Sequence, residues 1–155
     1  MPTILPPWPH LLFGVLEPLS LIAGSLAPLY DLEGFIAGQT PHPDPPTTHP
    51  SSIALALQLV NLYSLMFLVG VGVLHSTSEP KVVRNYFVGL AIADVGHIYA
   101  TYLAMGWDAF IDIGAWNALT WGNIGVTGFL FVNRIAHLMG MFEPAKAPKV
   151  PSKRE

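Results

Sequence analysis

Three ionisable side chains stand inside apolar segments that are long enough to cross a lipid bilayer: Glu17, Asp94 and Arg134. A charged residue at the centre of a membrane helix costs about 2.5 to 3.5 kcal/mol on insertion scales. Such residues are therefore rare, and they face the interior of a helix bundle or a polar cavity. Two carboxyl groups in different surroundings can serve as a proton donor and a proton acceptor. We therefore expect the function of the chain to reside at these three residues.

The composition is that of a membrane protein. The chain has 155 residues, of which 52% are hydrophobic and only 11% are charged, whereas soluble domains are about 25% charged. The apolar residues form runs near the roughly 20 residues that a bilayer core requires. The sequence predicts one all-α membrane domain over residues 1–142 and a polar tail over 143–155, with spans at about 9–29, 52–75, 82–105 and 116–140.

Basic residues are confined to one side of this arrangement. The predicted loops 30–52 and 106–116 contain no Lys or Arg, while Lys81 and Arg84 lie in the turn between the second and third spans. The tail holds four more basic residues, Lys146, Lys149, Lys153 and Arg154. The positive-inside rule then predicts an integral membrane four-helix bundle with both ends of the chain in the cytosol. The net charge of −3 gives no basic surface for nucleic acid.

Depth along the spans places the three charges at a similar level. At about 1.5 Å per residue, Glu17 lies roughly 12 Å, Asp94 roughly 18 Å and Arg134 roughly 9 Å from the predicted cytosolic ends of their spans. Two acids and one guanidinium at one level can pair, which lowers the cost of burying each. Arg134 has two other interpretations, a structural counter-ion or a helix-end residue that extends to the membrane surface.

Polar side chains recur along one face of each predicted span. His97 follows Asp94 by three residues, so the two share a helix face, and we include His97 among the candidate catalytic residues. The residues predicted to orient water or substrate are Asn61, Tyr63, Tyr86, Asn117, Trp121 and Asn123. The alternative is that polar residues join the helices, at about 0.6 kcal/mol each, and that Trp121 belongs to an interfacial belt. No spacing typical of a metal site is present, so no metal and no cofactor is predicted.

Pro18 directly follows Glu17. Proline has no backbone N–H, so it cannot bond to the carbonyl of Gly14, and it tends to kink a helix. We expect the kink to open space beside the acid and to leave that carbonyl free.

Several patterns carry a resemblance to a known family. They are the Glu17-Pro18 pair, the Asp94-x-x-His97 step and the Trp-Asn…Trp-Gly-Asn…Arg series from Trp116 to Arg134, in that order. Over about residues 8–140, the chain resembles a family of small fungal four-span membrane proteins. Members are encoded beside polyketide biosynthetic genes, including those for aurovertin- and citreoviridin-type polyenes, and are assigned there as epoxide hydrolases. The resemblance implies a hydrophobic polyene or polyketide epoxide as substrate. We expect the protein to lie in the endoplasmic reticulum membrane.

Epoxide opening needs an acid to protonate the leaving oxygen and a base to activate the nucleophile. The carboxyl group farther from Arg134 would be the acid and the nearer one the base. We favour Asp94 as base and Glu17 as acid, with the reverse assignment open. A substrate hydroxyl in place of water would make the enzyme a cyclase. Other readings are a terpene-type cyclase or double-bond isomerase, which stabilises a carbocation, and a non-catalytic lipid- or sterol-binding protein. A dimer is compatible with each reading.

Overall fold

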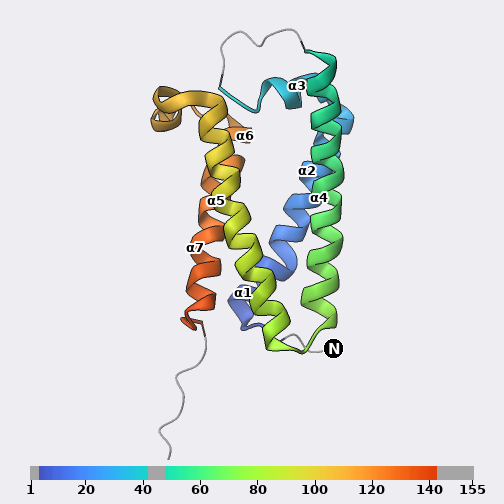
Figure 1. Cartoon of the computed structure of the whole chain (residues 1–155), viewed down its shortest axis with the longest axis vertical. Helices are drawn as coiled ribbons and strands as arrows, with labels where there is room; N and C mark the ends of the chain where they lie inside the picture. Colours follow the sequence, from blue (N-terminus) through green and yellow to red (C-terminus); the bar gives the residue numbers. More distant parts are fainter. Residues whose placement is uncertain (1–3, 42–47, 143–155) are drawn as a thin grey trace, which may run out of the picture.

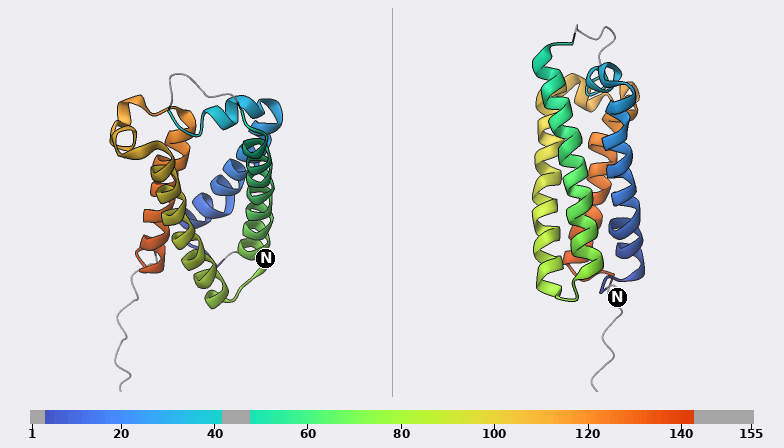
Figure 2. Two further views of the ribbon diagram at one scale, coloured as in Figure 1. Left: turned by 45° about the horizontal axis from the view of Figure 1, so that its top comes forward. Right: turned by 90° about the vertical axis from the view of Figure 1, so that its right-hand side faces the viewer.

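A computed structural model describes residues 4–41 and 48–142 of the chain. Within these ranges every regular element is a helix, which confirms the all-α prediction. Four long helical segments run alternately up and down and lie together as a bundle (Figures 1 and 2). The predicted tail, residues 143–155, lies outside the described residues.

The first segment is irregular at the position where proline predicted a disturbance. It consists of α1 (Pro7–Leu11), the π-helix η1 (Leu12–Leu16) and α2 (Glu17–Tyr30). A short helix follows, α3 (Leu32–Ala37), in the region predicted as a loop. The Asp31 side chain caps α3 by accepting a hydrogen bond from the Gly34 amide at 2.8 Å. A capping aspartate at the start of a helix satisfies an amide that would otherwise lack a partner, which explains the departure from the expected loop.

The second and third segments are continuous helices, α4 (Pro50–Ser76) and α5 (Pro80–Ile111). Each begins with proline, whose missing N–H costs nothing at that position. Helix α5 extends beyond the predicted end at residue 105, because Gly106 adopts a φ of 79° and lets the chain turn before a further helical stretch. The predicted loop 106–116 is therefore largely helical, and it includes the 3-10 turn η2 (Ile113–Ala115).

The fourth segment runs without a break from α6 (Ala118–Thr120) through the π-helix η3 (Trp121–Val126) into α7 (Thr127–Leu138). Among the described residues, the three other segments are long and apolar enough to cross a membrane: Pro7–Tyr30, Pro50–Ser76 and Pro80–Ile111. Many large apolar side chains on the outside of these helices are exposed, as a lipid-facing surface requires. Membrane crossing by the fourth segment stays a prediction.

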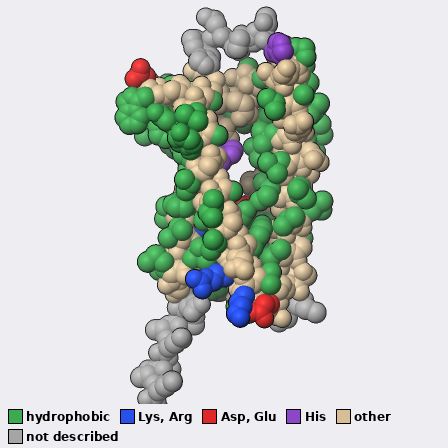
Figure 3. Space-filling view, viewed as in Figure 1, with side chains coloured by type: hydrophobic (Ala, Val, Ile, Leu, Met, Phe, Trp, Pro, Cys, Tyr) green, Lys and Arg blue, Asp and Glu red, His purple; other side chains and the backbone are tan. Residues whose placement is uncertain are grey.

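The bundle is made of two helix pairs. Helix α2 packs against α4, and α5 packs against α7. The pairs meet near the turn that joins α4 to α5 and diverge toward the end that carries α3 and α6 (Figure 1). An apolar cluster closes the narrow end: Leu5, Leu12, Phe13, Leu74, Val83 and Phe87. Above this cluster, the face between α4 and α5 is hollowed, and a histidine side chain is visible inside the hollow (Figure 3).

Candidate functional site

Arg134 bonds to both acids, which are largely but not fully buried, and we call the three residues the Arg134 triad. Its Nη1 donates a hydrogen bond to Oδ2 of Asp94 at 2.8 Å, and its Nη2 donates to Oε1 of Glu17. Helices α7, α5 and α2 supply the three residues, so the triad joins the two helix pairs. The predicted pairing is confirmed. Because Arg134 is fully buried inside the bundle, the interpretation that it extends to the membrane surface is wrong.

One side of the triad is sealed by aromatic rings. The Phe13 ring centroid lies 5.0 Å from the guanidinium carbon of Arg134 and 4.8 Å from the Phe87 ring. Both rings belong to the apolar cluster that closes the narrow end of the bundle. A cation over an aromatic face is stabilised by the ring quadrupole. The carboxyl side chains of Glu17 and Asp94 retain 12% and 13% exposure, whereas Arg134 is fully buried.

The carbonyl of Gly14 is not free, which corrects the expectation from Pro18. The Nε2 atom of His75, near the end of α4, lies 3.0 Å from the Gly14 carbonyl oxygen. His10 stacks edge-on against the same imidazole, with ring centroids 5.7 Å apart. The π-helix η1 places Gly14 one turn before Glu17. A histidine from another helix therefore supplies the hydrogen bond that Pro18 cannot make.

A second polar group lies beyond the triad and contains His97. The Nε2 of His97 is 3.3 Å from Oδ1 of Asn123, and Nδ2 of Asn123 donates to Oε1 of Gln39 at 3.1 Å. Gln39 in turn donates through Nε2 to the carbonyl of Phe35 at 3.1 Å. The contacts connect α5, the π-helix η3 and the end of α3. We call this chain of hydrogen bonds the His97 ladder.

Three of the predicted binding residues lie elsewhere. Asn117 caps α6, because its Oδ1 accepts from the Thr120 amide at 2.8 Å. Trp121 is 48% exposed and packs edge-on against Trp116, as expected for an interfacial belt. Asn61 is exposed on α4. Within the described residues, none of Asn61, Asn117 and Trp121 has a hydrogen bond to the triad.

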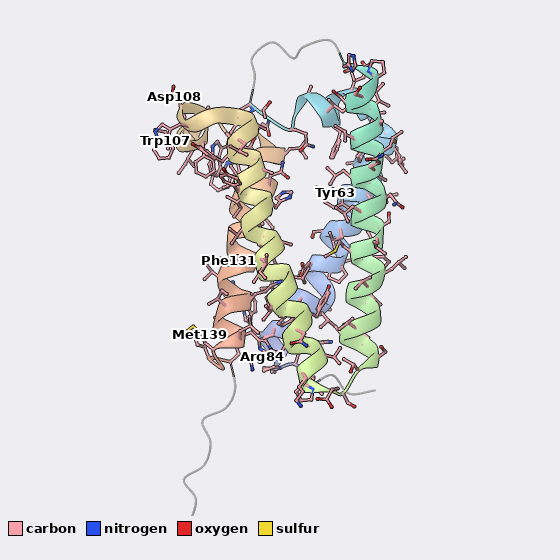
Figure 4. The ribbon with its side chains drawn as sticks, viewed as in Figure 1. Tyr63, Arg84, Trp107, Asp108, Phe131 and Met139 are labelled. Carbon is pink, nitrogen blue, oxygen red and sulfur yellow. The ribbon has the colours of Figure 1, made fainter. Side chains whose placement is uncertain are left out.

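The two predicted tyrosines pack between helices. The ring of Tyr63 covers Gly24 of α2, where an added Cβ would lie 3.2 Å from the ring. Tyr63 is labelled on α4 in Figure 4. The Tyr86 hydroxyl would lie 2.8 Å from a Cβ at Gly70 of α4. Both tyrosines therefore join neighbouring helices, and the two glycines make room for them.

Three residues of the site were missed by the sequence analysis: Phe13, Gln39 and His75. Phe13 precedes Glu17 by four residues, which would place both on one face of a regular helix, but the π-helix η1 covers this stretch. The freed Gly14 carbonyl also required a donor, but nothing in the sequence indicated His75. Gln39 lies outside every predicted span and carried no signal.

Two pockets lie outside the triad. One, of about 610 Å³, lies at the end where α5 begins and includes Arg84 and His137 in its lining. The other, of about 400 Å³, is lined by aromatic residues of α5, mainly Tyr99, Tyr102 and Phe110, and by Phe131 of α7. Among the described residues, no group of three His, Asp or Glu side chains could hold a metal ion.

Comparison with known proteins places the chain in a family without an assigned activity. A family described as "Domain of unknown function (DUF7704)" matches residues 2–144, and the chain belongs to it. No curated protein matches the chain, and no solved structure does.

Proposed function

We propose that this DUF7704 protein is a membrane-embedded enzyme that opens epoxides by acid–base catalysis at the Arg134 triad. The observation that carries the proposal is one fully buried guanidinium bonded to two carboxyl groups, Glu17 and Asp94. A purely structural ion pair needs only one acid, and each extra buried charge adds a desolvation cost. Two acids on one cation are suited to holding and moving a proton.

The proton balance of the triad fits such a reaction. With both acids ionised, the triad would carry a net charge of −1, and with one proton it is neutral, which a low-dielectric site favours. The protonated acid gives its proton to the epoxide oxygen as the C–O bond breaks. The ionised acid takes a proton from the attacking water, whose oxygen forms the new C–O bond. The triad thus ends with one proton, as it began, now on the other carboxyl group.

Both acids contact Arg134, so distance from the cation does not show which carboxyl group is the proton donor and which is the acceptor. Glu17 as the donor and Asp94 as the acceptor stays our assignment, because Asp94 shares a helix face with His97. Since Arg134 bonds to both acids, the two proton arrangements keep the same contacts. A proton can therefore return to Glu17 without rebuilding the site.

The surroundings of the triad support an apolar substrate. The hollow between α4 and α5 (Figure 3) lies among helices whose outer surfaces are apolar, so it suits a molecule that partitions into the bilayer. A hydrophobic polyene or polyketide epoxide of fungal secondary metabolism meets this requirement. Attack by water gives a diol, and attack by a substrate hydroxyl gives an oxygen heterocycle.

The proposal includes four membrane spans with both ends in the cytosol, in the endoplasmic reticulum membrane. Lys and Arg side chains gather at the end with the α4–α5 turn (Figure 3), and Arg84 and Asp108 lie at opposite ends of the bundle (Figure 4). This separation supports the orientation by the positive-inside rule. The η3 and α7 parts of the fourth segment pack against α5, which supports its placement in the membrane.

Product analysis tests the proposed reaction. Microsomes that contain the protein are incubated with a polyene epoxide in ¹⁸O-labelled water, and the products are analysed by mass spectrometry. Gain of one labelled water supports the hydrolase, and an isomer of unchanged mass that contains an oxygen ring supports the cyclase. An isomer with a shifted double bond or a new carbon ring would contradict the proposed epoxide opening and would indicate isomerase or terpene-type cyclase activity. Binding without turnover would indicate a lipid- or sterol-binding protein.

A further inference from the structure

The His97 ladder has a fixed direction, because it ends on a backbone carbonyl. The carbonyl oxygen of Phe35 can only accept a hydrogen bond. The Gln39 atom beside it, 3.1 Å away, must therefore be the amide nitrogen. This orients Gln39 so that its oxygen faces Asn123.

The orientation of Gln39 in turn fixes which atoms donate and accept at Asn123 and His97. The Asn123 atom that lies 3.1 Å from the Gln39 oxygen must be its nitrogen, so the Asn123 oxygen faces His97. At 3.3 Å from that oxygen, the Nε2 atom of His97 must carry a hydrogen. Neutral imidazole has one N–H and one acceptor nitrogen, and the acceptor is then Nδ1.

We propose that the ladder fixes His97 in the Nε2–H tautomer, so that Nδ1 accepts a hydrogen bond from the molecule that occupies the hollow. Gln39 and Asn123 are positioning residues that act through His97. The use of Nδ1 in catalysis rests on the proposed function: it accepts a hydrogen bond from one O–H of the water that attacks the epoxide, while the ionised carboxylate takes the proton of the other. The tautomer itself does not depend on that function.

The turn that carries Gln39 makes another hydrogen bond, to the residue that precedes α6. Asn117 Nδ2 donates to the carbonyl of Gly38 at 3.0 Å, one residue before Gln39. The Thr101 hydroxyl donates to the backbone carbonyl of His97 at 3.0 Å. The Asn117 contact thus ties the turn that carries Gln39 to the start of the fourth segment, while the Thr101 contact is local to helix α5 and bonds the main chain of His97.

Nuclear magnetic resonance of protein labelled with ¹⁵N-histidine tests the proposal without any substrate. The protein is measured in detergent micelles, above the pH at which imidazole is protonated, and the His97 signals are identified by their loss in His97→Gln. We expect the Nε2–H tautomer in the parent chain and a mixture in Asn123→Leu and Gln39→Leu. Asn123→Asp should retain the Nε2–H form, because its carboxylate still accepts from Nε2. The matched control Gln58→Leu, at an exposed position of α4, should change nothing.

An Nδ1–H tautomer in the parent chain would overturn the proposal, and so would an unchanged Nε2–H population in Asn123→Leu. Turnover adds a separate measurement: Gln39→Leu should lower kcat by about 10-fold with little change in KM, since general-base assistance is worth about 10²–10⁴-fold and here is only partly lost. If the protein shows the expected tautomer but turns over no epoxide, the role of the ladder in fixing His97 is supported and the proposed reaction is contradicted.

Discussion

The Nε2 atom of His75 donates a hydrogen bond, at 3.0 Å, to the Gly14 carbonyl that Pro18 cannot reach. Gly14 is buried, and its carbonyl can only accept. The contact joins the end of α4 to the π-helix one turn before Glu17. The position of Glu17 therefore depends on a residue that is far away in the sequence.

We expect His75→Leu to destabilise the protein by about 1–3 kcal/mol, because it leaves a buried acceptor without a partner. For a chain of this size, that corresponds to a fall in Tm of about 2–4 °C per kcal/mol. His75→Gln should cost less, because its side-chain amide can still donate. Thermal unfolding in detergent measures both changes.

Pro18→Ala provides the control for this contact. Alanine restores a backbone N–H that can bond to the Gly14 carbonyl, so His75→Leu should cost little in that background. An equal loss of stability in both backgrounds would show that His75 contributes packing and not the missing hydrogen bond.

Arg134 allows stability to be separated from chemistry. Arg134→Leu leaves two buried acids without a cation, and breaking a buried pair in this way costs about 3–5 kcal/mol. The triple variant Glu17→Gln, Asp94→Asn, Arg134→Leu removes the stranded acids together with the cation, and we expect it to recover most of that loss while staying inactive. Arg134→Lys should fold but turn over slowly, because a single ammonium replaces a planar two-pronged contact.

A triple variant as unstable as Arg134→Leu would contradict this explanation, because the loss would then come from missing guanidinium packing against Phe13. Normal turnover in Arg134→Lys would show that bridging of both acids is unnecessary.

Asn117 separates the predicted binding role from the capping role seen in the structure. Asn117→Ala should lower stability by about 1 kcal/mol through loss of the α6 cap, with KM unchanged. Asn117→Asp keeps an acceptor for the Thr120 amide and should retain the contribution of the cap, but it loses the hydrogen bond that Nδ2 donates to the Gly38 carbonyl. A marked rise in KM in a variant of normal stability would indicate that Asn117 contributes to substrate binding after all.

Cysteine labelling tests the proposed orientation, because the chain contains no cysteine of its own. Lys81→Cys lies at the α4–α5 turn, and Glu33→Cys lies in α3 at the opposite end; both positions are exposed. In sealed microsomes, we expect a membrane-impermeant maleimide to label Lys81→Cys directly and Glu33→Cys only after permeabilisation. The reverse pattern would place both ends of the chain in the lumen, and direct labelling of both would show that the helices do not separate two compartments.

The sequence was sufficient to predict the helices and the triad because both follow from strong local signals. Long apolar runs mark membrane helices, and a charge within such a run requires a partner. With only Arg134 available to two acids at a similar depth, the pairing followed. The short helix α3 was missed, because its Asp31 cap lies between a long apolar segment and a proline-rich stretch that together suggested a loop.

The His97 ladder and the His75 contact could not be predicted in the same way. Each joins residues from separate helices through one side chain, and its formation depends on helix rotation and on the two π-helices. A π-helix inserts one residue into the helical register and turns the following side chains to a new face. Asn123 lies within one such segment and Glu17 directly follows the other, so their orientations depend on details that an ideal helix repeat does not contain.

Turnover by Glu17→Gln and Asp94→Asn tests the central claim most directly, with Glu33→Gln and Asp108→Asn at exposed positions as matched controls. Both triad variants keep the shape of the side chain and remove its ability to transfer a proton. Consumption of a polyene epoxide by protein of verified fold should fall about 10²–10⁴-fold in each triad variant, and the two controls should match the parent chain. Near-normal rates in either triad variant would contradict acid–base catalysis by the two carboxyl groups.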